Sequence, residues 1–235
     1  MHTTENGAAT PSFLLRVSAL IGLALLAGTS AVEAAKGPQP TICLRSCWGA
    51  RAPQCSIPQM SALTRAIIHH TGAAPEYSTN YETSKAKCRS NQAYVMDSLG
   101  YCDADYHFYV DAAGNLFEGR AGSMSSLPRG SHDGCNSNSF GFAALGYFHP
   151  PHNQTFTTAM RNSLEAVIAW RMPSEWSATG SGTYCSKTVG TMDGHYKVKA
   201  TACPGDGIIP LIPSMRTGVM NRKNGGSSSV IVDNS

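Results

Sequence analysis

Charge is scarce in this sequence, and neither sign dominates. Asp, Glu, Lys and Arg together make up 14% of the 235 residues, and the formal net charge is +3. Nucleic-acid binding usually needs a strongly basic surface, so this balance predicts no nucleic-acid partner. No apolar run reaches the roughly 20 residues that a transmembrane helix needs, which excludes a multi-span membrane protein.

Hydrophobic residues, by contrast, are plentiful. They make up 42% of the chain, enough to build a core and too many for extended disorder. At about 150 residues per domain, the length predicts one domain with appendages. Eight cysteines are more than a cytosolic protein of this size usually carries and fewer than a disulfide-stabilised miniprotein has.

The first residues have the pattern of a secretory signal peptide. A dense apolar run of about 11 residues, from Val17 to Ala27, follows Arg16, and the small residues around Glu33 offer a cleavage site after Ala34. We expect residues 1–34 to be removed, with no stable membrane insertion of the mature chain. A single uncleaved membrane anchor is the alternative.

A signal peptide predicts a secreted protein, extracellular or, in a Gram-negative bacterium, periplasmic. An oxidising compartment of this kind allows disulfides. After the signal we expect a short amino-terminal arm over residues 35–41 and one domain over 42–215. Residues 216–235 end in a Gly- and Ser-rich stretch and are predicted to form a flexible tail.

Strand and helix patterns alternate along the predicted domain. Short β-branched or alternating runs predict strands, and longer runs without Gly or Pro predict helices. This order predicts an α/β fold with a central mixed sheet flanked by helices. The expected strands are Ala66–His70, Tyr106–Val110, Leu116–Gly119 and Ser139–Leu145, and the expected helices are Thr83–Met96, with Thr83 as its cap, and Thr157–Arg171.

Three residues suggest a metal site. His69 lies in the first expected strand, and His195 and Cys203 are separated by the loop-length spacing His-x7-Cys. Two imidazoles and one thiolate would leave the fourth position of a tetrahedral zinc ion open to water, which is typical of catalytic zinc. By itself the spacing also fits structural residues.

Several collinear motifs run through the domain: Trp48–Arg51, Ile67–Thr71, Gln92–Gly100, Asp105–Phe108, Gly114–Arg120, Ser131–His132, Asn136–Ser137, Phe140–Phe148 and Gly194–Asp206. Together they are similar to those of peptidoglycan recognition proteins of the zinc amidase type, relatives of the phage lysozyme-like, type 2 N-acetylmuramoyl-L-alanine amidases. The similarity covers residues 42–215 and implies a single amidase and peptidoglycan-recognition domain.

The resemblance implies a catalytic centre built from five residues. His69, His195 and Cys203 match the ligands of a Zn²⁺ cofactor. Tyr106 matches the active-site tyrosine and Thr201 a catalytic polar position, where a hydroxyl would stabilise the oxyanion of amide hydrolysis. Structural roles stay open for the last two, as a packed sheet-edge ring and a loop hydroxyl bonded to backbone. The next residue after the first ligand, a second histidine, should point to the opposite face of the strand.

Five further residues match positions that line the family's substrate groove: Gly100, Tyr101, Arg120, His132 and Asn136. Gly100 and Arg120 resemble the pair that recognises meso-diaminopimelate, because Arg can bind the extra carboxylate with two hydrogen bonds. Tyr101 stands where Trp is usual, so lysine recognition stays open, as does a surface role for Arg120. The His132–Asn136 stretch is one residue shorter than usual, which leaves the contact of Asn136 open.

The implied activity is hydrolysis of the amide bond between N-acetylmuramic acid and L-alanine of the peptidoglycan stem peptide. Peptidoglycan or its muropeptides would be the partner, and we expect a monomer. The alternatives are a non-catalytic peptidoglycan-binding receptor, which typically lacks the ligand cysteine, and a protein inhibitor on the same fold. Wall recycling, attack on competitors and innate immunity all remain open as biological roles.

With Cys203 kept for the metal, seven cysteines remain, and an odd number predicts at least one that is free or intermolecular. Cys43, Cys47 and Cys55 lie near the mature amino terminus, where they are expected to staple the arm. The family's usual disulfide needs two cysteines shortly after the first strand, and only Cys88 is present there. The connectivity therefore stays open.

Overall fold

The computed structural model describes residues 36–225. The predicted signal peptide, residues 1–34, and the end of the predicted tail, residues 226–235, lie outside this range. Within it, no helix combines the length and apolar character needed to cross a bilayer.

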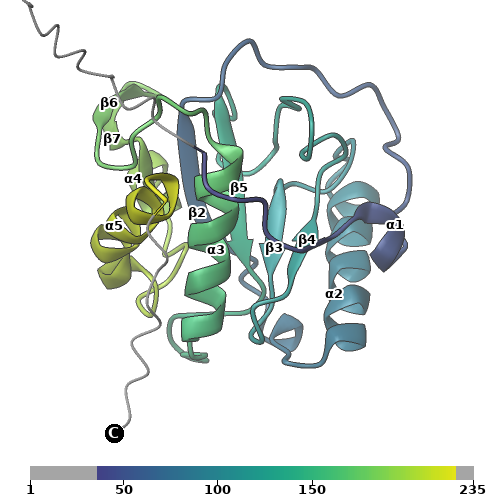
Figure 1. Ribbon diagram of the computed structural model, residues 1–235. Helices are drawn as coiled ribbons and strands as arrows, with labels where there is room; N and C mark the ends of the chain where they lie inside the picture. Colours follow the sequence, from purple (N-terminus) through teal and green to yellow (C-terminus); the bar gives the residue numbers. More distant parts are fainter. Residues whose placement is uncertain (1–35, 226–235) are drawn as a thin grey trace, which may run out of the picture. The chain divides into compact units, whose positions relative to one another are not determined.

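The centre of the fold is a six-stranded mixed sheet (Figure 1). Its strands are β1 Ile42–Cys43, β2 Arg65–His70, β3 Phe108–Val110, β4 Leu116–Glu118, β5 Ser139–Ala144 and β8 Met192–Gly194. Their spatial order is β1-β4-β3-β5-β2-β8. β3 and β4 form the expected antiparallel hairpin, and the other neighbouring pairs are parallel. The predicted mixed sheet is confirmed.

One face of the sheet packs against two helices, α3 (Thr158–Arg171) and α5 (Ile212–Lys223), which also contact each other (Figure 1). Thr157 caps α3, because its hydroxyl oxygen accepts the Met160 N–H at 3.0 Å. The main hydrophobic core lies between sheet and helices and includes Ile68, Phe108, Phe140, Phe142, Leu164, Val167, Ile168, Met215 and Val219.

The tail prediction is wrong at its start. Residues 216–223 are not a flexible tail but the larger part of α5. Met215 and Val219 lie one helical turn apart and are both fully buried, so their contact with the core holds this segment in place. The polar residues between them concealed the helical pattern in the sequence.

The opposite face of the sheet is covered at one end by two helices, α1 (Arg45–Trp48) and α2 (Tyr81–Ala93), where a second hydrophobic cluster includes Trp48, Cys88, Tyr109 and Phe117. α2 begins earlier than predicted, because its cap is Asn80 and not Thr83. The Asn80 side chain accepts the Thr83 N–H at 2.9 Å. The described chain also contains three short helical segments: η1 Ala74–Glu76, η2 Tyr94–Ser98 and η3 Ile209–Leu211.

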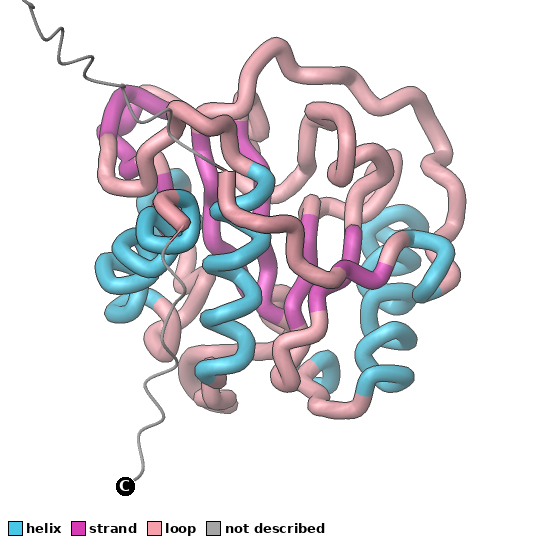
Figure 2. Tube along the Cα trace, in the orientation of Figure 1, coloured by secondary structure: helices cyan, strands magenta, loops and turns pink. Residues whose placement is uncertain are grey.

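At the other end, a two-stranded hairpin covers the same face. It consists of β6 (Ser181–Tyr184) and β7 (Lys187–Gly190), and it contacts the short helix α4 (His195–Val198). Its cluster joins Ile67 of β2 to Tyr184, Val189 and Val198. Long loops connect these elements, among them the segment between α1 and β2 (Figure 2).

Six of the eight cysteines are paired, as Cys43–Cys47, Cys55–Cys102 and Cys135–Cys185. Cys88 is free and fully buried, in line with the odd number that remained after Cys203 was set aside. Only the first pair joins two of the three cysteines that lie near the mature amino terminus, and it lies just after the arm. The third pair ties β6–β7 to the segment that carries His132.

Candidate metal centre and adjoining cavity

Three side chains capable of binding a metal converge beside β2. His69 lies near the end of this strand, His195 opens α4, and Cys203 lies in the loop that follows α4. One ligand atom from each lies within 4.8 Å of the other two. The structure therefore brings together the three residues that the sequence singled out.

The donor set fits a zinc ion. His195 Nε2 is buried and has no hydrogen-bond partner in the described part of the chain, which is unfavourable unless a ligand binds it. His69 Nδ1 faces Cys203 Sγ at 3.6 Å, and Cys203 takes part in no disulfide. Two imidazoles and one thiolate form the kind of site that leaves a fourth zinc position open.

Burial sets the protonation of these ligands. It lowers the pKa of His69 well below the usual value and also lowers the pKa of His195, so both rings are neutral, the form that binds metal. In the absence of a cation, burial raises the pKa of the Cys203 thiol to about 12. The His70 N–H donates to this sulfur at 3.4 Å and favours the thiolate.

Thr201 fixes the loop that carries Cys203. Its hydroxyl oxygen accepts the Cys203 N–H at 3.2 Å, and the Gly205 N–H donates to the Ala202 carbonyl oxygen at 2.7 Å. Thr201 is exposed, and its own hydroxyl hydrogen has no acceptor among the described residues. Thr201 thus makes the backbone hydrogen bond expected of a structural loop residue, while its hydroxyl hydrogen remains available to a ligand.

Tyr106 borders the same site. The centroid of its ring lies 4.9 Å from that of His69, and its hydroxyl donates to the His70 carbonyl oxygen at 3.3 Å. Burial raises the pKa of the phenol, so it keeps its proton. The His70 side chain turns to the other face of β2, near Tyr147 and His149, as the alternation of strand side chains predicts.

The structure places His132 against His69 rather than in an open groove. His132 Nδ1 lies 3.0 Å from His69 Nε2, and His132 is 6% exposed. Contact of this ring with substrate stays a prediction. Behind it lie three polar residues to which the sequence assigned no role: Asp133, Ser139 and Tyr184.

A cavity of about 280 Å³ is bordered by Arg120 and by the segment that leads to His132. Arg129, Ser131 and Asn136 also line it, together with Pro58, Cys102 and Gly130. Arg129 is a second cation that the sequence did not single out. The lining combines positive charge with hydroxyl and amide groups, which suits a carboxylate.

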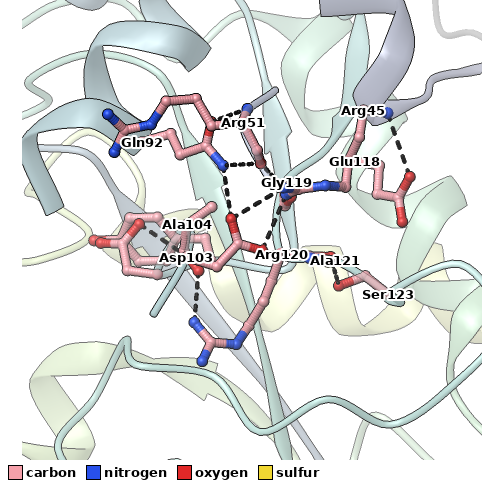
Figure 3. Close-up of polar contacts among 12 residues, drawn as sticks. Arg45, Arg51, Gln92, Asp103, Ala104, Glu118, Gly119, Arg120, Ala121 and Ser123 are labelled. Atoms are coloured by element: carbon pink, nitrogen blue, oxygen red, sulfur yellow. Dashed lines mark hydrogen bonds and ion pairs between the residues drawn. The ribbon is translucent and has the colours of Figure 1, made fainter. Parts of the chain in front are cut away.

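Arg120 is held in place from the protein side. Its Nη1 donates to the Ala104 carbonyl oxygen at 2.8 Å (Figure 3), and its Nε is buried without a partner in the described chain. The nearby Asp103 is occupied by Arg45 at 3.1 Å and Gln92 at 2.7 Å. Arg120 is 3% exposed, so it is not a surface cation.

The other three predicted groove residues differ in position. The Asn136 side-chain oxygen accepts the N–H groups of His132 and Asp133 at 2.6 and 3.1 Å, so Asn136 shapes the loop as well as lining the cavity. Gly100 is exposed and Tyr101 half-buried. They precede the cavity residue Cys102 but are not among the described residues that line the cavity.

Comparison with known proteins identifies the family. Residues 59–206 match the family described as N-acetylmuramoyl-L-alanine amidase. Peptidoglycan-recognition protein SC2 of Drosophila simulans is 33% identical over 173 residues, 72% of this chain and 82% of that protein. The chain belongs to this family of peptidoglycan recognition proteins and amidases. Peptidoglycan recognition protein 3 of Homo sapiens is 32% identical over 131 residues, 55% of this chain and 36% of the human protein.

Solved structures of peptidoglycan recognition proteins have the same fold. Drosophila PGRP-SD superposes with a TM-score of 0.60 at 24% identity, covering 74% of this chain and 94% of that one. Drosophila PGRP-LB gives a TM-score of 0.61 at 22% identity, with 74% and 93% covered. The resemblance and the fold expected from the sequence are both confirmed.

Proposed function

We propose that this protein is a secreted, zinc-dependent N-acetylmuramoyl-L-alanine amidase. It would hydrolyse the amide bond between the lactyl group of N-acetylmuramic acid and the L-alanine of the stem peptide. The observation that carries the proposal is the convergence of His69, His195 and Cys203, with His195 Nε2 buried and unpartnered in the described structure. Three disulfides support export to an oxidising compartment.

His69, His195 and Cys203 would hold the zinc ion. When bound, zinc lowers the pKa of a water molecule and polarises the scissile carbonyl. Hydrolysis adds the water oxygen to the lactyl carbonyl carbon, breaks the C–N bond and leaves a proton on the L-alanine nitrogen. His69 and His195 are neutral, and Cys203 carries no positive charge, so none of the three ligands would repel the zinc cation.

Tyr106 packs against His69, and Thr201 lies two residues before Cys203, so each would bring a hydroxyl donor to this chemistry. Both would stabilise the negative charge that develops on the carbonyl oxygen. Thr201 has a free hydroxyl hydrogen, whereas Tyr106 would exchange its present acceptor, the His70 carbonyl oxygen, for the substrate. The raised pKa of Tyr106 keeps this donor protonated at neutral pH.

The cavity beside Arg120 would receive the stem peptide. Two guanidinium groups, those of Arg120 and Arg129, border this cavity and suit the extra carboxylate of meso-diaminopimelate, so we propose this type of peptidoglycan as the preferred substrate. Two similar folds point to the same ligands: PGRP-LE was solved with a monomeric diaminopimelic acid-type peptidoglycan, and a PGRP-LB variant with tracheal cytotoxin.

The second candidate function is a receptor that binds peptidoglycan without cleaving it. The relatives that are named recognition proteins favour it. The complete donor set favours the enzyme, because recognition alone needs neither a buried thiol nor an unpartnered imidazole nitrogen at this position. The two functions make the same prediction for binding and opposite predictions for turnover.

The test is turnover of diaminopimelate-type peptidoglycan by the purified, zinc-loaded protein, with products identified by mass spectrometry. Cys203→Ala removes a ligand, and Cys88→Ala is the matched control, because Cys88 is also free and buried but lies outside the site. We expect the wild type and Cys88→Ala to release stem peptides with a free L-alanine amine, and Cys203→Ala to release none. Wall binding without release by the wild type would favour the receptor.

A further inference from the structure

His69 uses both of its ring nitrogens. Nδ1 faces Cys203 Sγ at 3.6 Å, which places it on the side where the three ligand atoms meet. Nε2 points the other way and lies 3.0 Å from His132 Nδ1. A neutral imidazole has one N–H and one lone pair. If Nδ1 gives its lone pair to a metal, the proton is on Nε2 and is donated to His132.

The groups behind His132 offer an acceptor to its other ring nitrogen, Nε2. With Nδ1 accepting, its proton is on Nε2, which lies 3.4 Å from Ser139 Oγ. Ser139 Oγ is 2.7 Å from the Tyr184 hydroxyl, and that hydroxyl donates to Asp133 Oδ2 at 2.7 Å. With that tautomer, every donor in this chain points away from His69, and the chain ends on the Asp133 carboxylate, which accepts only. Asp133 Oδ2 also lies 3.7 Å from His132 Nδ1, beyond hydrogen-bond distance, so the shorter 3.0 Å contact of Nδ1 is the one with His69.

Two glycines, Gly130 and Gly141, leave the space that the His132 ring fills. A β-carbon at Gly141 would lie 2.7 Å from His132 Cγ, and one at Gly130 would lie 2.4 Å from its Cδ2. Both distances are far below van der Waals contact, so these two glycines make the space that the ring fills. The adjoining segment is also tied to β6–β7 by the Cys135–Cys185 disulfide and by the bond between Tyr184 and Asp133.

We propose that His132 is a positioning residue of the metal centre, which holds His69 in the tautomer that offers Nδ1 to zinc. Its function is to accept the His69 Nε2 proton, with Ser139, Tyr184 and Asp133 fixing its own orientation. The inference rests on the zinc site proposed above. It gives this chain an outer shell of the kind that orients histidine ligands and raises their basicity in metal sites.

The first test measures the zinc dissociation constant by competition with a chelator. His132→Phe fills the same space without an acceptor and is expected to weaken zinc binding about 10- to 100-fold. His132→Gln retains a side-chain oxygen and is expected to recover part of that loss. Thermal unfolding of each zinc-free variant verifies that it is folded.

His107→Gln is the matched control. His107 is also fully buried, and the centroid of its ring is 5.5 Å from that of His132, but its nitrogens bind Pro128 and Gly141 and no metal ligand. It should bind zinc like the wild type. A folded His132→Phe variant with wild-type zinc affinity would overturn the proposal. Equal losses of zinc affinity in His132→Phe and His107→Gln would also overturn it.

A second measurement needs no variant. Long-range ¹H–¹⁵N correlation spectra of the ¹⁵N-histidine-labelled wild-type protein report which ring nitrogen carries each proton. We expect His69 to be protonated at Nε2 with and without zinc, and His132 also at Nε2. A proton on His69 Nδ1 in the zinc-free protein would contradict the inference. Zinc affinity and the tautomer of His69 are both measured without turnover. They test the role of His132, whereas product release tests the amidase activity, so the two proposals can fail separately.

Discussion

A 2.8 Å hydrogen bond from Arg120 Nη1 to the Ala104 carbonyl oxygen holds the Arg120 side chain at the edge of the 280 Å³ cavity. The same geometry leaves Arg120 Nε buried and unpartnered in the described chain. A guanidinium fixed in this way is ready to bind a carboxylate with little loss of side-chain entropy. The position of Arg120 therefore predicts a measurable preference for diaminopimelate-type over lysine-type muropeptides.

Replacing Arg120 by Lys should lower the affinity for a diaminopimelate-type muropeptide about tenfold, because the ammonium keeps the charge but loses the planar pair of donors. Affinity for the lysine-type muropeptide, which lacks the extra carboxylate, should change little. Titration calorimetry with both ligands measures the difference. Arg161→Lys on α3, at the other face of the sheet, is the control. Equal losses for the two ligands would exclude carboxylate recognition by Arg120.

Asp105 should make the stability depend on pH. Its carboxyl accepts the Tyr106 N–H at 3.0 Å and the Tyr109 hydroxyl at 3.2 Å, and burial raises its pKa to about 7. The unfolded chain has an Asp pKa of about 4. Between these values the folded state binds the extra proton, so this group lowers the free energy of unfolding as pH rises from about 4 to 7.

Asp105→Asn keeps the acceptor oxygen and removes the titration. Relative to the wild type, the variant should therefore be more stable at pH 7.5 than at pH 4.5, as measured by urea unfolding. Comparing the two proteins cancels the opposite contribution of His70, whose pKa burial lowers to about 4. Asp97→Asn is the control, because a hydrogen bond from Arg51 lowers the pKa of this exposed carboxyl. A wild-type-to-variant difference that is constant with pH would refute the assignment.

The strand that carries His69 could be predicted from the sequence because its signal is local. Alternation along β2 separates His69 from His70, and the β-branched run marks the strand itself. The ends of the helices were harder to predict from the sequence. Asn80 outcompetes Thr83 as a cap through one hydrogen bond, and the end of α5 depends on buried contacts of Met215 and Val219.

Zinc binding should release one proton per ion over the neutral range. The pKa of the metal-free Cys203 thiol is raised to about 12, so this group is protonated until the metal displaces its proton. His69 and His195 have lowered pKa values and are already neutral above pH 6.5. The logarithm of the zinc association constant should rise by about one for each pH unit between 6.5 and 8. A pH-independent constant would mean that Cys203 is not a ligand.

The groups around the metal ligands are the part of the site that the sequence could not reveal. Asp133 is next to a residue that was singled out, but its contact with Tyr184 spans 51 positions. The role of Ser139 depends on the pairing of β5 with β2, which brings the start of β5 beside Arg65. Such contacts come from the tertiary fold, and no local pattern of residue types encodes them.

Hydrolysis of purified peptidoglycan by the zinc-loaded protein in ¹⁸O-labelled water tests directly whether the protein is an amidase. An amidase that breaks the bond to L-alanine transfers the water oxygen to the lactyl carboxylate of N-acetylmuramic acid. Mass spectrometry should therefore find one ¹⁸O on the released glycan fragment, none on the stem peptide, and no product with Cys203→Ala. Label on the stem peptide, or no cleavage by a protein that binds both zinc and the cell wall, would show that the protein is not this amidase.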